Sequence, residues 1–126
     1  MTDARRRAEA TAIFKLGLEA SKAGVHRTLN RPPAGKGWVQ CVGAPAGLMC
    51  RPAKVRESIE LFRKAYQLWP DIVALNQIAL GHEMVGEREA AREGFTRMRE
   101  QAIAESIPAH VQAAGLGMAR LDASGS

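Results

Sequence analysis

The sequence has few aromatic residues, few cysteines and no long apolar run. Aromatic residues make up only 5% of its 126 residues, whereas alanine, leucine, glutamate and arginine are abundant, which favours helices over sheets. No stretch of about 18 apolar residues that could span a membrane is present, and the charged N-terminus is not followed by the apolar segment of a signal peptide. We therefore expect one all-α domain, covering residues 1–126, in the cytoplasm.

The sequence also lacks a recognisable catalytic or metal-binding pattern. Two cysteines, Cys41 and Cys50, are too few for a disulfide framework and too far apart for a zinc knuckle. The three histidines fall in a loop, in a helical packing position and in a terminal helix, and no nucleophile or acid/base pair accompanies them. We expect no enzymatic activity, no cofactor and no metal site.

Apolar periodicity and helix-breaking residues divide the chain into helices and one insertion. Residues 3–24 are good helix formers that end at a glycine, and helical periodicity returns over residues 55–104, where Pro70 and Gly86 separate three core helices. Residues 108–121 predict a capping helix. Between the first two helices, residues 25–54 contain glycines and prolines at short intervals, which predicts an irregular insertion loop.

Part of this insertion could form a short β-hairpin. Apolar residues flank the segment from Ala44 to Gly47, and with that segment as the loop Cys41 would face Cys50. The two sulfur atoms would then be close enough to form a disulfide under oxidising conditions, whereas in a reducing cytosol we expect free thiols.

One pattern of residues occurs twice along the chain. In the first helix of each pair, apolar and small residues precede a glycine corner, and in the second helix a small residue precedes an aromatic residue by four positions. The copies are Ile13, Leu16, Gly17, Ala20 and Gly24 with Ser58, Phe62, Ala65 and Pro70, and Leu75, Ile78, Ala79, His82 and Gly86 with Ala91, Phe95 and Met98. This pattern resembles the tetratricopeptide repeat. The resemblance implies a right-handed stack of antiparallel helix hairpins, about five helices in all, with the insertion inside the first hairpin.

The same resemblance implies a function, because tetratricopeptide repeats generally bind peptides or proteins in the concave groove lined by the first helix of each hairpin. We therefore expect an adaptor, scaffold or chaperone-like module with a protein or peptide partner and no membrane contact. Alternatively, this surface could be ordinary solvent-exposed surface, or it could make contacts between copies of the chain. The implied groove residues are Phe14, Leu18, Ser21 and Lys22 in the first helix and Asn76, Leu80, Glu83 and Met84 in the third.

The distribution of charge supports an alternative function. Residues 1–54 carry ten Lys/Arg and three Asp/Glu (+7), whereas residues 55–126 carry eight and ten (−2). In the insertion, Trp38 is accompanied by Arg31, Lys36 and Arg51, and an aromatic ring among cations can stack on a base while the cations bind phosphates. Nucleic-acid or polyanion binding through the basic N-terminal half is therefore the alternative, and Trp38 is the partner-binding candidate in the insertion.

Overall fold

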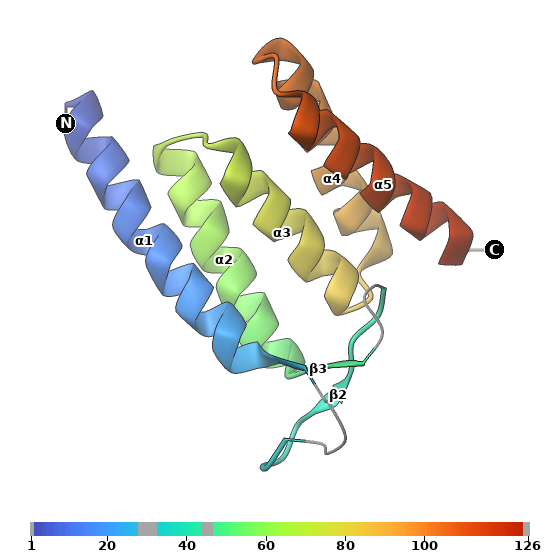
Figure 1. Cartoon of the computed structure of the whole chain (residues 1–126). Coiled ribbons are helices and arrows are strands. Elements are labelled where there is room, and N and C mark those ends of the chain that lie inside the picture. The colour runs from blue at the N-terminus through green and yellow to red at the C-terminus, as the bar shows by residue number, and fades with distance from the viewer. Residues whose placement is uncertain (1, 28–32, 44–46, 125–126) are drawn as a thin grey trace.

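Five helices form most of the structure over residues 2–27, 33–43 and 47–124, which the computed structural model describes. They are α1 (Asp3–Gly24), α2 (Pro52–Leu68), α3 (Ile72–Met84), α4 (Arg88–Ala104) and α5 (Pro108–Ser124). Successive helices run in opposite directions, and each packs against the next along the chain (Figure 1). The expectation of an all-α fold is confirmed. Within the described residues, no helix is both long enough and apolar enough to cross a bilayer.

Local sequence signals set the ends of the helices. The Thr2 side chain accepts a hydrogen bond from the Arg5 backbone N–H, and the Asp71 carboxylate accepts one from the Val73 N–H, so α1 and α3 each begin at a capping residue. Gly86, with φ of +79°, makes the corner between α3 and α4. The second helix begins at Pro52, three residues earlier than expected, because proline fits the first turn of a helix.

The core consists of two apolar clusters that share α3. The first cluster lies between α1, α2, α3 and the insertion, and the second lies between α3, α4 and α5. The half-buried Tyr66 packs against both. The buried residues of the first are Cys50, Val55, Ile59, Phe62 and Ile78, and those of the second are Ile72, Leu75, Ala79, Ala91, Phe95, Met98, Ala102, Ala114 and Leu121.

The repeat pattern predicts the packed face of α3 well and that of α1 less well. In α3, the expected residues from Leu75 to His82 are buried. In α1, the expected Leu16 is 52% exposed, and the buried residues are Ala10, Gly17, Ala20 and Gly24. The difference arises because α1 approaches α2 closely through its smallest side chains. A Cβ atom on Gly17 would lie 2.6 Å from the Phe62 ring.

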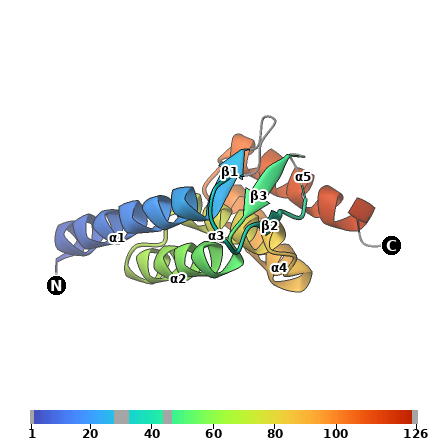
Figure 2. The same ribbon diagram turned by 90° about the horizontal axis from the view of Figure 1, so that it is seen from below.

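The insertion forms a small antiparallel sheet rather than an isolated hairpin. Its strands are β1 (Val25–Arg27), β2 (Val39–Gln40) and β3 (Leu48–Cys50), in the order β1-β3-β2. Val39, not Cys41, pairs with Cys50, so the expected register is wrong by two residues. The expected loop from Ala44 to Gly47 lies mostly outside the described residues. The sheet lies across the end of the stack where α1 finishes (Figures 1 and 2).

Cys41 and Cys50 are joined by a disulfide, with their Cα atoms 5.2 Å apart. The two cysteines are therefore as close as the disulfide expected under oxidising conditions requires, although they are not paired with each other in the sheet. Cys50 is 1% exposed and belongs to the first core cluster, so the insertion contributes to the core of the helical stack.

Candidate functional site

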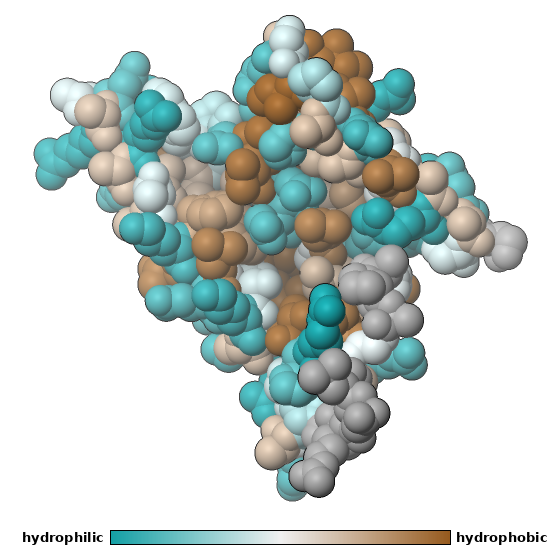
Figure 3. Space-filling model, viewed as in Figure 1, coloured by the Kyte–Doolittle hydropathy of each residue, from teal (hydrophilic) through white to brown (hydrophobic). Residues whose placement is uncertain are grey.

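An apolar recess lies between α1 and α3, with the end of α2 beneath it. It encloses a cavity of about 240 Å³ near the N-terminal halves of α1 and α3. On the face seen in Figure 3, the surface is hollowed between these helices, and apolar side chains lie at the bottom of the hollow. We call this feature the α1–α3 groove. Its lining residues are Arg7, Ala10, Thr11, Phe14, Ala65, Trp69, Asp71, Val73 and Ala74.

Small side chains make the groove possible. Ala10, Ala65 and Ala74 are buried, one from each of the three helices, and their methyl groups leave room that larger side chains would fill. Phe14 forms part of the wall, and its ring centroid lies 5.1 Å from that of Phe62 in the core. Since the Phe62 ring is itself buried, this contact fixes the position of the Phe14 wall.

Trp69 and two arginines form the charged side of the groove. Trp69 is the C-cap residue of α2, held just before Pro70 by a hydrogen bond from its backbone N–H to the Ala65 carbonyl. The guanidinium carbons of Arg6 and Arg7 lie 6.0 and 5.5 Å from the centroid of the Trp69 ring, within the range of cation–π attraction. Arg6 is also paired with the Asp3 carboxylate, so Arg7 is the arginine of the groove lining, which also contains Asp71.

Among the groove residues expected from the sequence, Phe14 lies in the α1–α3 groove and Lys22 is exposed at the far end of α1. Ser21, Asn76 and Leu80 are half-buried, and Leu80 packs against the second core cluster. Leu18 and Met84 pack against the first cluster, as do Val25 and Cys41 of the insertion. Leu18 and Met84 therefore lie beside the insertion, near the C-terminal ends of α1 and α3. The groove lies near the N-terminal halves of the same helices.

Glu83 is buried in an ion pair between α3 and α5. It is 4% exposed, and its two carboxylate oxygens accept hydrogen bonds of 2.9 and 2.8 Å from the Arg120 guanidinium. These hydrogen bonds raise the pKa of Arg120, against the opposing effect of burial. The Glu83 carboxylate is thus already occupied by a partner within the chain.

Trp38 lies in the insertion, away from the α1–α3 groove. Its indole N–H donates to the Ala34 carbonyl at 3.2 Å, and the Arg51 guanidinium lies 4.5 Å from its ring centroid. The His26 ring meets the indole edge-on at 6.0 Å between centroids. The neighbouring Arg31, also named as a basic candidate, lies outside the described residues.

Most residues of the groove are not among those expected from the repeat pattern. Trp69, Arg7, Ala10 and Thr11 line the groove but are not residues of the repeat pattern. One signal was available, since a tryptophan directly before a proline corner places a large ring beside the start of the next helix. Val73 and Ala74 follow that corner by a few residues, which is why Trp69 meets them in the groove.

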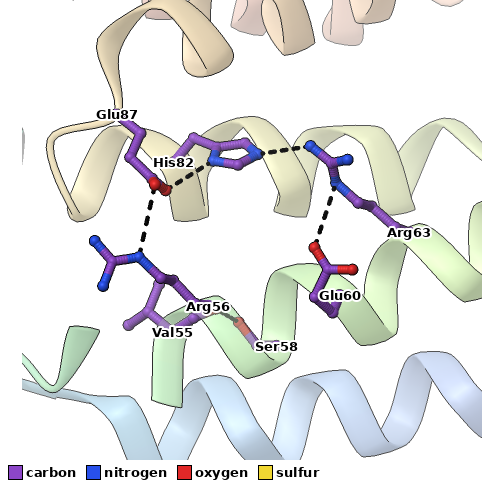
Figure 4. Close-up of polar contacts among 7 residues, drawn as sticks. All are labelled: Val55, Arg56, Ser58, Glu60, Arg63, His82 and Glu87. Carbon is purple, nitrogen blue, oxygen red and sulfur yellow. Dashed lines mark hydrogen bonds and ion pairs between the residues drawn. The ribbon is translucent and has the colours of Figure 1, made fainter. Parts of the chain in front are cut away.

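A polar network lies on another face, where α2, α3 and the start of α4 meet (Figure 4). The His82 Nδ1 atom lies 3.1 Å from a Glu87 carboxylate oxygen, and its Nε2 atom lies 3.3 Å from an Arg63 nitrogen. Arginine can only donate, so Nε2 accepts and Nδ1 carries the proton that Glu87 accepts. This hydrogen bond is the largest influence that lowers the pKa of Glu87, with help from Arg56.

His82 is a buried member of this hydrogen-bonded network. The lone pair of its Nε2 atom is already engaged by Arg63, and the side chain is buried. Arg63 and Arg56 are held in turn by Glu60 and Glu87. Within the described ranges, no group of three or more His, Cys, Asp or Glu side chains could hold a metal ion.

Comparisons of the chain with protein-family models, with curated proteins and with solved structures return no significant match. The assignment of function therefore depends on the α1–α3 groove and on the repeat pattern.

Proposed function

We propose that this chain is a non-enzymatic, tetratricopeptide-like module that binds a peptide or protein segment in the α1–α3 groove, as an adaptor, scaffold or chaperone-like protein. The observation that carries the proposal is the apolar cavity between the first helices of two successive hairpins. The repeat resemblance assigns partner binding to the face lined by these first helices, and Phe14 belongs both to that face and to the cavity.

The size of the cavity favours a peptide side chain over a small-molecule ligand. Its volume of about 240 Å³ is below the ~300–1,000 Å³ of pockets that enclose drug-sized ligands. Phe14, Val73 and the alanine floor provide apolar contacts for an anchoring side chain of leucine or phenylalanine. We therefore expect an extended segment with one or two apolar anchors rather than a cofactor.

The charge on the α1 side of the groove favours an acidic partner. Arg5, Arg6 and Arg7 occupy the first turns of α1, and Arg7 also lines the cavity. A carboxylate next to the apolar anchor would meet the Arg7 guanidinium, since arginine binds carboxylates with directed hydrogen bonds. The proposed occupant is thus a peptide with an apolar anchor flanked by aspartate or glutamate.

Fluorescence of Trp69 provides a direct test. The chain contains only two tryptophans, so Trp38→Phe leaves Trp69 as the single reporter, and it lines the groove. The probe is a short peptide with one leucine between glutamates, compared with the same peptide carrying lysines in their place. We expect the acidic peptide to shift the Trp69 emission in a saturable way and the lysine peptide to have a much smaller effect.

Two matched variants locate the binding site. Val73→Asp introduces a charge at a groove residue that is 40% exposed, whereas Ile103→Asp makes the same change at a 58% exposed residue of α4 outside the groove lining. We expect Val73→Asp to weaken peptide binding by about tenfold or more, equivalent to ~1.4 kcal/mol, and Ile103→Asp to leave it unchanged. Equal losses in both variants, or no change in Trp69 emission at millimolar peptide, would argue against the groove.

The same titration distinguishes the polyanion alternative. The Trp38 ring is already contacted by Arg51 and His26, so a stacking base would compete with contacts inside the chain. Polyanion binding should weaken steeply as salt is raised, whereas an anchored peptide should lose only the contribution of its acidic residues. Binding of a single-stranded oligonucleotide that exceeds peptide binding and falls steeply with salt would favour the alternative.

A further inference from the structure

The disulfide joins a weakly held segment to a firmly held one. Cys50 ends β3 inside the first core cluster, and the next residue, Arg51, donates its backbone N–H to the Gly24 carbonyl at the end of α1. Cys41 is half-buried and follows β2, a strand of only two residues. The covalent bond therefore links the segment after β2 to the place where α1 ends and α2 begins.

Beyond Cys41, the segment lies against the last turn of α3. The Val42 backbone N–H donates to the Met84 carbonyl at 2.9 Å, and a Cβ atom added to Gly43 would lie 2.8 Å from a Glu83 carboxylate oxygen. Val42 and Gly43, at the end of the segment formed by residues 39–43, thus cover the C-terminal end of α3, next to the carboxylate that binds Arg120 of α5.

Among the described residues, few other interactions hold residues 39–43 in this position. Besides the β2–β3 pairing, the Cys41 N–H donates to the Leu48 carbonyl and the Val42 N–H to Met84. The side chains of Val39 and Val42 are about half exposed, so the segment buries little apolar surface. A segment with few buried contacts opens at low free-energy cost. Within the part of the chain that the structure describes, the disulfide is consequently the strongest constraint on the segment.

We propose that the Cys41–Cys50 disulfide is a redox-controlled clasp, which holds residues 39–43 over the end of α3 when oxidised and releases them when reduced, while the helices stay packed. The helices stay packed because the thiol of Cys50 still fills its place in the first cluster after reduction. This role goes beyond the proposed peptide binding and does not depend on it.

The chemistry is thiol–disulfide exchange with a dithiol reductant. A thiolate of the reductant attacks the sulfur of Cys41, the more accessible of the two, forming a mixed disulfide and releasing Cys50 as a thiolate that takes up a proton. The second thiolate of the reductant then attacks the other sulfur of the same reductant, which is bonded to Cys41 in the mixed disulfide. Cys41 leaves as a thiolate and is protonated, so the reductant becomes a disulfide and the chain gains two thiols.

Hydrogen exchange followed by mass spectrometry tests the clasp in the full chain, oxidised and after treatment with dithiothreitol. We expect the Cys41 and Val42 amides to exchange faster after reduction by up to about 100-fold, the factor that closing a loop of this length contributes. Exchange in α1, α2 and α4 should change little. The variant Cys41→Ser, which leaves Cys50 in the core, should exchange rapidly at Val42 with or without reductant.

Alkylation provides a second readout. In the reduced protein, we expect iodoacetamide to modify Cys41 much faster than Cys50, because only Cys41 leaves with the released segment. Unchanged exchange at Cys41 and Val42 after complete reduction would overturn the clasp. Equal acceleration across α1, α2 and α3, or equal labelling of both cysteines, would also overturn it, since the disulfide would then stabilise the whole fold.

Discussion

The ion pair between Glu83 and Arg120 is the most deeply buried charged contact among the described residues, and it links α3 to α5. Glu83→Gln removes one charge and leaves the Arg120 guanidinium with a single amide acceptor. Because hydrogen bonds to charged groups contribute more than neutral ones, we expect a loss of about 2 kcal/mol in the free energy of unfolding, measured by urea denaturation.

A matched substitution at an exposed ion pair separates the effect of burial on stability from the effect of removing a charge. Glu93→Gln removes the partner of Arg97, but both of those side chains are about two-thirds exposed. This change should therefore alter the stability by no more than a few tenths of a kcal/mol. If the two variants were equally stable, the Glu83 carboxylate would be solvated in solution rather than buried.

The lowered pKa of Glu87 predicts that the folded chain loses a little stability in acid. Its pKa is lowered in the folded chain, mainly by the hydrogen bond from His82, so folding favours the ionised carboxylate. The stabilisation is present above the pKa of an unfolded glutamate, near ~4.3, and is lost as the pH falls through the lower folded value. We expect thermal melts of the parent to show a steeper decline in stability below about pH 4.5 than those of Glu87→Gln. A steeper decline in the variant would contradict the assigned hydrogen bond.

At the scale of elements, two glycines of α5 provide a test of close helix packing. A Cβ atom on Gly117 would lie 2.6 Å from the Phe95 ring, whereas one on Gly115 would meet nothing within 4 Å. We expect Gly117→Ala to destabilise the chain by about 1–3 kcal/mol through overpacking. Gly115→Ala should instead stabilise it by up to ~1 kcal/mol, because alanine is the better helix former.

The two variants can be compared by thermal melting. A stabilising Gly117→Ala would mean that α5 lies further from α4 than the structure places it. A similar close approach occurs in the first hairpin, where Gly17 meets Phe62, so Gly17→Ala should behave like Gly117→Ala.

The helices could be predicted from the sequence because their signals are local. The α3 cap at Asp71 and the corner at Gly86 act on their own neighbours, and the packed face of α3 repeats at helical spacing. The face of α1 was predicted less well, because its position depends on a glycine contact with Phe62 across the hairpin. The small residues Gly17 and Ala20 of the pattern are buried as expected, whereas its large residue Leu16 is exposed.

The sheet and the groove could not be predicted to the same extent, since both depend on contacts between distant segments. Strand β1 falls within the segment that the sequence predicts to be an irregular loop, and its partner β3 lies more than twenty residues away. The groove brings Arg7 beside Trp69 and Val73, residues that no local pattern connects. Of the groove residues expected from the repeat, only Phe14 lines the cavity.

At the scale of the whole molecule, α3 connects the two core clusters. Its Ile78 belongs to the first cluster, whereas Leu75 and Ala79 belong to the second, so neither cluster can lose α3 without exposing residues of the other. Tyr66 also packs on both. In a linear stack, such shared elements determine whether neighbouring units unfold together or separately.

We therefore expect the oxidised chain to unfold in a single transition. In the Trp38→Phe background, Trp69 reports on the groove near the first cluster, while circular dichroism reports on all the helices. Phe95→Ala lies in the second cluster and should cost ~3–5 kcal/mol, and it should shift the fluorescence and dichroism curves in urea by the same amount. A shift in dichroism that left the Trp69 curve in place would mean that α4 and α5 unfold independently, because coupling through α3 requires the groove to lose its structure when the second cluster does.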